Sequence, residues 1–241
     1  MLRAQDIAKM IDHALLRPDM TAEEVRAGCQ IARQYECRTV CIKPCDVAIA
    51  VEELAESDVS VSTVIGFPHG SNLTAVKVLE SEMAILQGCK ELDMVLNIGR
   101  LVGGDYDYVE HDIRTVCETA HKRGAIVKVI FENAYLSADQ IAQAAQIAEQ
   151  AGADYIKTST GFGPHGALLE DLRIMKGNVS DKVKLKAAGG VRTLDDALAA
   201  LAAGCTRIGA SATAKIVDEA RRLESEGRLE IPAEPTGLAI K

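Results

Sequence analysis

Two lysines stand at the ends of short apolar segments, where a charged amine is unusual. Lys157 ends the run "ADYIK", and Lys186 lies near the end of "KVKLKAAGG". Two ammonium groups that lie close together depress each other's pKa, because each disfavours the other's charge. A neutral lysine amine can attack a carbonyl carbon to form a Schiff base, whose iminium is an electron sink for an adjacent carbon–carbon bond. The pair therefore indicates carbonyl chemistry through a lysine imine.

A carboxylate accompanies the lysines in the pattern. Gly88 precedes Asp93 by five positions, and Gly152 precedes Lys157 by five positions as well. Strands that begin in matching register would place both side chains on one face of the sheet at a similar height. In that arrangement Asp93 is a candidate for moving protons, through water or through Lys186.

Charged residues within strands also have a simpler explanation. A single lysine can lie on an outer strand face near an edge and extend its amine into water. That alternative weakens when several lysines and carboxylates occupy interior strands covered by helices, because unpaired buried charges are costly. Such groups are instead expected to pair with one another around a water-filled functional cavity. Lys128 shares strand parity with Glu132 and is assigned to a structural pair.

Glycine-rich turns supply a second feature. The segments "AAGGVRT" and "RIGASAT" each end a predicted strand just before a helix, and "STG" follows Lys157. Small residues at such turns let backbone N–H groups reach a phosphate, and the helix N-terminus adds a favourable field. Glycines at these turns are common for geometric reasons alone. Two such turns in the last two units, beside a lysine pair, favour a phosphate site.

Helix and strand signals alternate along the whole chain, and these elements must position the residues above. Helical segments end at glycines such as Gly124, Gly152 and Gly204, and a strand follows each. Such alternation favours parallel strands joined by helical crossovers. Seven strands are clear, and an eighth would be short and early, within "KMIDHALL". The pattern predicts an α/β fold, a single-domain (β/α)8 TIM barrel, with a doubly wound sheet as the alternative.

Local signals place several helix boundaries. In the segment 73–87, Val76, Leu79, Met83 and Leu86 keep helical spacing, and Asn72 is the expected cap. Capping boxes, in which a hydroxyl residue is followed three positions later by Glu, Gln or Asp, predict three further helix starts. The three pairs are Thr21–Glu24, Ser137–Gln140 and Thr193–Asp196.

Composition limits the function classes. The chain has 241 residues with a formal net charge of −8, which argues against a nucleic-acid surface. Seven cysteines without a CxxC motif indicate reduced thiols and a cytoplasmic protein rather than a metal or disulfide framework. We expect no secretion signal and no membrane span. One domain is expected over 1–241, with an irregular and mobile tail over 225–241.

The residues together resemble the deoxyribose-phosphate aldolase family of class I aldolases, which are (β/α)8 barrels. The resemblance covers about residues 11–213, and "AGADYIKTSTGF" with "LKAAGGVRT" is its most specific part. Further support comes from "DHALL", "VCIKP", "STVIGFPHG", "ELDMVLNIG", "KVIFEN" and "RIGAS". The resemblance implies reversible cleavage of 2-deoxy-D-ribose 5-phosphate into D-glyceraldehyde 3-phosphate and acetaldehyde, without a metal or another cofactor.

The resemblance also implies roles for individual residues. Lys157 falls on the Schiff-base lysine in the sixth strand, Lys186 on the second active-site lysine, and Asp93 on the aspartate of the proton relay. Asp12, in "DHALL", matches a further polar position of the site. By the family pattern, substrate phosphate would be bound, largely through backbone amides, by Gly161, Gly189, Gly190, Gly209 and Ser211.

Four positions depart from the family pattern or vary within it. Ala14 and Asn133 each stand where the family usually has threonine, and Ala212 stands where a second serine is frequent. Lys43, in "CIKP", is a candidate for binding an anionic substrate group, with a solvated rim residue as the alternative. These differences leave open a Schiff-base aldolase acting on another phosphorylated sugar. A phosphate-sugar binding barrel without catalysis is a further alternative, and a homodimer is the expected assembly.

Overall fold

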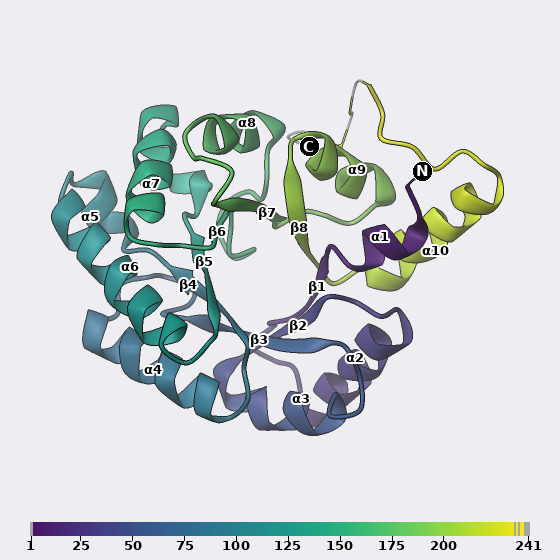
Figure 1. Cartoon of the computed structure of the whole chain (residues 1–241), viewed down its shortest axis with the longest axis horizontal. Coiled ribbons are helices and arrows are strands. Elements are labelled where there is room, and N and C mark those ends of the chain that lie inside the picture. The colour runs from purple at the N-terminus through teal and green to yellow at the C-terminus, as the bar shows by residue number, and fades with distance from the viewer. Residues whose placement is uncertain (1, 234, 236, 239–241) are drawn as a thin grey trace.

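The computed structural model describes residues 2–233, 235, 237 and 238. Eight parallel strands alternate with helices, as Figure 1 shows. The strands are β1 Ile11–Leu15, β2 Thr39–Ile42, β3 Ser60–Ile65, β4 Glu91–Val95, β5 Ile126–Ile130, β6 Tyr155–Lys157, β7 Lys184–Ala188 and β8 Cys205–Ala210. The helices are α1 Ala4–Ala8, α2 Ala22–Gln34, α3 Val47–Glu53, α4 Thr74–Leu86, α5 Ile98–Val102, α6 Tyr106–His121, α7 Ala138–Gln150, α8 Leu169–Gly177, α9 Leu194–Ala202 and α10 Thr213–Ser225, with short 3-10 turns η1 Pro44–Asp46 and η2 Asn133–Tyr135.

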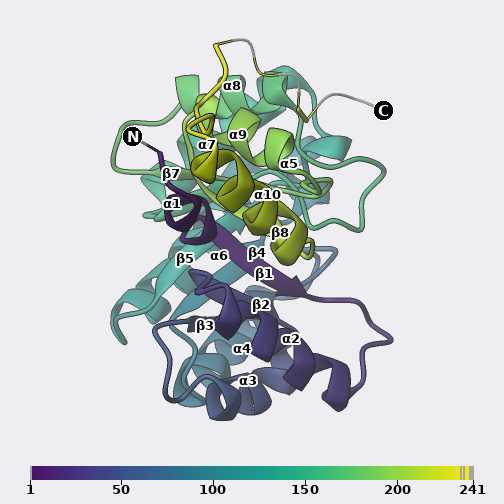
Figure 2. The ribbon, with the colours of Figure 1, turned by 90° about the vertical axis from the view of Figure 1, so that its right-hand side faces the viewer.

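The sheet closes on itself. Each strand pairs in parallel with the next, and β1 pairs with both β2 and β8. The helices form an outer ring around this barrel (Figures 1 and 2). The predicted (β/α)8 barrel is therefore confirmed, the doubly wound sheet is excluded, and the short early strand predicted within "KMIDHALL" is β1.

The capping boxes act as predicted. Thr21, Ser137 and Thr193 each accept a hydrogen bond from the backbone N–H three residues later. In each pair the second side chain accepts one from the backbone N–H of the first residue. The expected cap at Asn72 is wrong, because α4 begins one position later with Leu73 at its cap. The short helices α1, α3 and α5 had no clear periodic signal and were not predicted.

Helix α4 turns a polar side toward the barrel. Lys77, Ser81 and Ala84 are its buried residues. The Lys77 ammonium donates to Asp112 of α6 at 2.6 Å and to the Val95 carbonyl at 2.8 Å. The helix predicted over this segment is confirmed, but the four apolar side chains of the predicted spacing are exposed, namely Val76, Leu79, Met83 and Leu86.

The apolar core lies between the sheet and the helices. Strand residues of one parity, such as Val127, Val129, Ile156 and Ile208, are fully buried in one continuous apolar cluster with the helix faces. Residues of the other parity point into the barrel, because successive strand side chains alternate. The interior set is mostly polar, so the strand pattern separates an aliphatic layer from a charged centre.

The C-terminal segment is described in part. Residues 234, 236 and 239–241 of the tail lie outside the described residues. Leu238 is buried, and its N–H donates to Asp196 at the start of α9. The mobility predicted for 225–241 stays a prediction. Within the part of the chain that the structure describes, no helix has the length and apolar character that a membrane crossing requires.

Candidate active site

Charged side chains from six strands meet inside the barrel. All of them are buried or nearly so, and each makes at least one ion pair within the group. They are Asp12 of β1, Glu91 and Asp93 of β4, Lys128 of β5, Lys157 of β6, Lys186 of β7 and Arg207 of β8.

The two lysines predicted from the sequence converge on one carboxylate. Lys157 and Lys186 are direct partners in the register of β6 and β7. Their ammonium nitrogens lie 2.8 and 2.7 Å from the same atom, Oδ2 of Asp93. The structure thus brings all three predicted catalytic residues into contact. The matching register expected for Asp93 and Lys157 is wrong, because Asp93 pairs through Lys128 with Tyr155, two residues before Lys157.

Asp12 and Arg207 extend the group across the barrel. Lys186 also donates to Oδ2 of Asp12, whose other oxygen accepts from Arg207 at 2.5 Å. Arg207 in turn forms a two-pronged contact with Glu91, at 2.9 Å through each nitrogen. This geometry matches the planar fork of a guanidinium to a carboxylate, which fixes the orientation of both groups.

Lys128 is surrounded by carboxylates of the charged group. Its ammonium pairs with Asp93 and Glu91 at 2.7 Å each and lies 3.4 Å from Asp12. Glu132, which shares its parity in the sequence, is not its partner. The strand ends at Ile130, and Glu132 adopts a left-handed conformation with φ 57° that directs its carboxylate to Thr160.

The count of charges identifies the amine that is easiest to deprotonate. The group holds three carboxylates and four basic side chains. Among the basic side chains, Lys157 pairs with one carboxylate, whereas Lys128, Lys186 and Arg207 each pair with two or more. Loss of one proton from Lys157 makes the buried group neutral as a whole.

The pKa directions agree with this count. Burial lowers the pKa of Lys157, and the neighbouring Lys186 ammonium lowers it further, against the opposing effect of Asp93. Burial also acts to lower the pKa of Lys186, but Asp12 and Asp93 outweigh it and raise that pKa overall. The sequence argument attributed the depressed pKa to repulsion between the lysines. In the structure, desolvation by burial is the larger cause of the lowered pKa of Lys157, and repulsion by Lys186 is the second.

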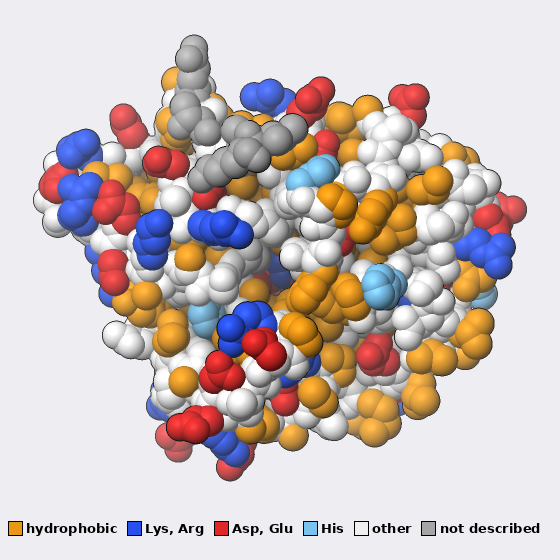
Figure 3. Space-filling view, turned by 180° about the vertical axis from the view of Figure 1, so that it is seen from behind, with side chains coloured by type: hydrophobic (Ala, Val, Ile, Leu, Met, Phe, Trp, Pro, Cys, Tyr) orange, Lys and Arg blue, Asp and Glu red, His pale blue; other side chains and the backbone are white. Residues whose placement is uncertain are grey.

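A cavity of about 230 Å³ opens over these lysines at the carboxyl ends of the strands. In Figure 2 the β1 arrow points toward the face on which this cavity opens. Figure 3 shows the molecule from that face. Asp12, Lys157 and Lys186 line its floor, together with Arg17 and Arg192 at its rim. The five residues assigned to phosphate also line it, namely Gly161, Gly189, Gly190, Gly209 and Ser211.

Backbone conformation explains several of these glycines. Gly161, Gly189 and Gly190 have φ of 92°, 79° and 84°, in the left-handed region that a side chain disfavours. At Gly209 a Cβ atom would approach Cβ of Ala188 to 3.1 Å. Ser211 lies two residues before the start of α10, so the backbone around it adjoins the N-terminus of that helix.

Two of the departures noted in the sequence lie apart from this cavity. The Lys43 ammonium donates to the Met20 carbonyl at 3.0 Å and pairs with Asp46 at 3.2 Å. Cys41 of β2, rather than Lys43 just after that strand, is among the described residues that line the cavity. Asn133 is buried and donates to Asp171 on α8, whereas Ala14 does line the cavity.

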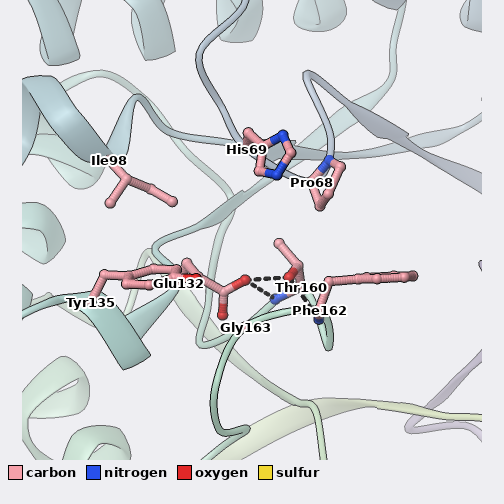
Figure 4. Close-up of a pocket in the computed structure, with 8 residues that line it drawn as sticks. All are labelled: Pro68, His69, Ile98, Glu132, Tyr135, Thr160, Phe162 and Gly163. Atoms are coloured by element: carbon pink, nitrogen blue, oxygen red, sulfur yellow. Dashed lines mark hydrogen bonds between the residues drawn. The ribbon is translucent and has the colours of Figure 1, made fainter.

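A second hollow of about 270 Å³ adjoins the first, and Figure 4 shows the residues that line it. Thr160 and Phe162 line both hollows, so the segment after Lys157 separates them. Glu132 accepts hydrogen bonds from the Thr160 amide and hydroxyl, and its other carboxylate oxygen is buried without a partner among the described residues. Glu132 therefore holds the loop that links Lys157 to Gly161.

Sequence reasoning missed Glu91 and Arg207 as members of the charged group. A signal was present, because Glu91 lies two positions before Asp93 and Arg207 two positions before Gly209, with the same strand parity. Period-two alternation would have placed both in the barrel interior. Their pairing with each other could not be read, because β4 and β8 become opposed only when the barrel closes.

A closed parallel barrel with a cavity at the carboxyl ends of its strands defines the (β/α)8 class, in which active sites lie at that end of the barrel. Comparison with known proteins gives the family. Residues 7–216 match the DeoC/LacD family of aldolases, and this chain belongs to that family. It is therefore an aldolase, a carbon–carbon lyase.

Individual relatives agree with the family match. A deoxyribose-phosphate aldolase of Caldanaerobacter subterraneus subsp. tengcongensis is 49% identical over 215 residues, which cover 89% of this chain and 93% of the relative. A solved structure from Coccidioides immitis superposes with a TM-score of 0.88 at 40% identity, over 91% of this chain and 87% of that chain. The deoxyribose phosphate aldolase of Aeropyrum pernix, described as tetrameric, superposes with a TM-score of 0.85 at 29% identity, over 91% and 93% of the two chains.

Proposed function

We propose that this aldolase reversibly cleaves 2-deoxy-D-ribose 5-phosphate to D-glyceraldehyde 3-phosphate and acetaldehyde through a Schiff base on Lys157. The observation that carries the proposal is the convergence of Lys157 and Lys186 on Asp93, beneath a cavity edged by glycine turns. The names of the relatives support the choice of substrate.

The first steps of the reaction use the neutral amine. Nζ of Lys157 attacks the C1 aldehyde of the open-chain sugar, and loss of water gives a protonated imine. A base then removes the proton of the C3 hydroxyl, the C2–C3 bond breaks, and its electron pair moves toward the imine nitrogen to form an enamine. The departing fragment is D-glyceraldehyde 3-phosphate.

The remaining steps restore the enzyme. Protonation of the enamine at C2 regenerates an imine, and water hydrolyses it to acetaldehyde and free Lys157. Asp93 and Lys186 are assigned the proton transfers, because Asp93 contacts the Lys157 amine where the imine forms and Lys186 donates to the same oxygen of Asp93. Asp12 keeps Lys186 charged and oriented, since it accepts a hydrogen bond from that ammonium and raises its pKa.

The phosphate group is assigned to the other end of the cavity. Backbone N–H groups near Gly161, Gly189, Gly190 and Gly209, together with Ser211, offer hydrogen-bond donors. Arg17 and Arg192 line the same cavity and supply positive charge. The local field therefore suits a dianion although the chain as a whole carries a net charge of −8.

Imine trapping tests the proposal directly. Borohydride is added with 2-deoxy-D-ribose 5-phosphate present, and the digested protein is analysed by mass spectrometry. We expect a two-carbon or sugar adduct on the peptide that contains Lys157, and none on that peptide in Lys157→Leu. Absence of any adduct from a protein that turns the substrate over would refute the Schiff-base assignment, and binding without turnover or adduct would favour a non-catalytic sugar-phosphate barrel.

A second candidate keeps the chemistry and changes the sugar. Ala14 lines the cavity, and Ala212 lies beside Ser211 where a serine is frequent in the family. A panel of phosphorylated aldoses and ketoses decides between the candidates. A phosphorylated sugar cleaved with a much higher kcat/KM than deoxyribose 5-phosphate would favour this reading.

The proposal also covers the cellular compartment and the assembly of the enzyme. All seven cysteines are free thiols, which suits the reducing cytoplasm. The tetrameric description of the Aeropyrum pernix relative supports self-association of this chain as well.

A further inference from the structure

The loop after β6 carries Gly161, one of the residues assigned to substrate phosphate. We call residues 158–167 the β6 loop. Gly161 is exposed and lines the cavity over the lysines. Its N–H has no acceptor among the described residues, and a Cβ atom there would find no neighbour within 4 Å. This donor faces open space, so its direction depends on how the loop is held.

Backbone hydrogen bonds hold both ends of the β6 loop. At its start, the Phe131 N–H donates to the Lys157 carbonyl at 3.0 Å, and the Thr158 N–H donates to the Lys186 carbonyl at 3.2 Å. At its end, the Ala167 N–H donates to the carbonyl of Gly189 at 2.9 Å. None of these contacts involves a side chain. The main chain therefore sets the position of Lys157 without help from the middle of the loop.

The middle of the β6 loop depends on a single side chain. Oε2 of Glu132 accepts hydrogen bonds from the Thr160 N–H at 3.2 Å and from the Thr160 hydroxyl, as the dashed lines in Figure 4 show. The same hydroxyl accepts from the Phe162 N–H at 3.0 Å. For residues 159–166, Glu132 is the one hydrogen-bond partner outside the loop among the described residues. It therefore fixes the residues on both sides of Gly161.

The chain around Glu132 is shaped to its carboxyl group. Glu132 is 2% exposed and has φ 57°, a left-handed conformation that is costly for a residue with a side chain. A Cβ atom at Gly163 would lie 2.9 Å from both Cδ and Oε1 of Glu132, so glycine is needed at that position. Backbone strain of this kind clusters at functional sites, which favours a role for Glu132 beyond packing.

We propose that Glu132 is a positioning residue for substrate phosphate. Through Thr160 it fixes the N–H of Gly161 at the edge of the cavity, and it thereby sets the preference of the enzyme for a phosphorylated sugar over an unphosphorylated one. The inference rests on the proposed function, in which the substrate carries a phosphate. Because the main chain holds Lys157 separately, loss of the Glu132 side chain acts on phosphate binding more than on imine formation.

Steady-state kinetics with two sugars test this role. The measured quantity is the ratio of kcat/KM for 2-deoxy-D-ribose 5-phosphate to kcat/KM for unphosphorylated 2-deoxyribose. Glu132→Ala is expected to lower this ratio about 10-fold to 100-fold, chiefly through a higher KM for the phosphorylated sugar. Glu132→Gln keeps an oxygen acceptor for Thr160 and is expected to recover most of the ratio. An unchanged ratio in Glu132→Ala, or equal losses with both sugars, would overturn the proposal.

Asp154→Ala is the matched control. Asp154 immediately precedes β6 and accepts a hydrogen bond from the Val127 N–H of β5 at 2.8 Å. This carboxylate therefore links the same two strands at the opposite end of the barrel. Its removal is expected to lower stability and to keep the ratio for the two sugars. A ratio that falls as far in Asp154→Ala as in Glu132→Ala would assign the effect to general loosening of the strand pair and contradict the proposal.

Thr160→Val tests the same contact from its other side and serves if Glu132→Ala does not fold. Valine keeps the size of threonine but removes the hydroxyl that joins Glu132 to the Phe162 N–H. We expect the ratio to fall in this variant as well. The double variant Glu132→Ala/Thr160→Val should lose little more than the larger of the two single losses, because both remove one connection. Fully additive losses would contradict a shared path to Gly161.

Two measurements without turnover separate this inference from the proposed function. Hydrogen exchange followed by mass spectrometry is expected to be faster in the peptide covering 159–166 in Glu132→Ala, with little change at the Thr158 amide. Titration with inorganic phosphate, followed by ³¹P NMR, is expected to give a dissociation constant about 10-fold higher in Glu132→Ala than in Asp154→Ala. Unchanged exchange of the loop, or phosphate binding that is absent or equal in the two variants, would overturn the proposal whichever sugar the enzyme cleaves.

Discussion

Lys157 and Lys186 are direct register partners on β6 and β7, and both donate to Oδ2 of Asp93. One carboxylate oxygen therefore holds two amines whose pKa values move in opposite directions. The pKa of Lys157 falls through burial and through the neighbouring ammonium, and the pKa of Lys186 rises because Asp12 and Asp93 outweigh its burial. The lowered pKa suits Lys157 to nucleophilic attack, and the raised pKa keeps Lys186 positively charged.

Lys186→Met is expected to move the pH dependence of the reaction. Removing its ammonium takes away one of the two effects that lower the pKa of Lys157. A larger share of Lys157 is then protonated at neutral pH, so the acidic limb of the kcat/KM profile moves to higher pH and activity at pH 7 falls about 100-fold or more. The profile of Lys184→Met, an exposed lysine on the same strand, is expected to keep the original limb. An unshifted limb in Lys186→Met would contradict this electrostatic role.

Asp93→Asn is expected to separate imine formation from turnover. Asp93 raises the pKa of Lys157, so its neutralisation leaves the amine no less able to attack a carbonyl. The proton transfers lose their carboxylate, and kcat is expected to fall about 100-fold to 10,000-fold. Borohydride should still attach substrate to Lys157. Equal loss of trapping and turnover, in a variant whose circular dichroism spectrum is unchanged, would argue against the relay.

Ser211→Ala is expected to act on phosphate recognition alone. Ser211 lines the cavity and precedes the N-terminus of α10. Loss of a hydrogen bond to a charged group corresponds to about 1.5–3 kcal/mol, so kcat/KM for the phosphorylated sugar is expected to fall about 10-fold to 100-fold. The rate with unphosphorylated 2-deoxyribose serves as the control and should not change. A parallel loss with both sugars would place Ser211 elsewhere in the mechanism.

The Glu91–Arg207 pair is expected to behave as a coupled unit in unfolding. Glu91→Gln and Arg207→Met each leave a buried charge without its two-pronged partner, at a cost of about 3–5 kcal/mol of unfolding free energy. The double variant is expected to lose less than the sum of the two single losses, as measured by urea unfolding. Arg222→Met, at an exposed ion pair on α10, should change stability little. Strict additivity would show that the contact carries no coupling.

His13 is expected to make the protein less stable as the pH falls. Its imidazole is buried against Thr213 on α10, and burial lowers its pKa from 6.5 to about 4. The unfolded chain takes up a proton below pH 6.5 and the folded chain does so only near pH 4, so stability is full above 6.5 and is lost through this window.

The loss attributable to His13 is about 2 to 3 kcal/mol between pH 7.5 and 4.5. Urea unfolding of His13→Asn at the two pH values should show a difference smaller by that amount. Replacement of the exposed His111 by Asn is the control. An unchanged difference in His13→Asn would mean that the imidazole is protonated in the folded state.

Much of the fold could be predicted from local signals. The alternation of helices and strands, the capping boxes and the early strand at "DHALL" depend on residues close together in the chain. The site was predictable to the same degree, because Asp93, Lys157 and Lys186 stand at comparable distances from the start or end of their strands. Register pairs Lys157 directly with Lys186, but Asp93 is offset from Lys157 by two residues, so the contact of Asp93 with both lysines could not be predicted from register alone.

Other features depend on contacts that the linear sequence does not contain. The inward face of α4 is set by Lys77 and Asp112, which belong to different helices. The environment of Lys43 depends on the Met20 carbonyl from the loop between β1 and α2. Glu132 lies beyond the end of its strand because a left-handed residue redirects the chain, so strand parity no longer applies to it.

The charged centre of the barrel has a consequence for heat tolerance. Hydration of ions becomes less favourable as temperature rises, so the penalty for keeping charges out of water shrinks on warming. The interior of this barrel is held by Asp12, Glu91, Asp93, Lys128, Lys186 and Arg207 rather than by aliphatic packing. The ion pairs are therefore expected to stabilise the barrel more strongly as temperature rises, whereas the stabilisation from an apolar interior of the same size would stop increasing.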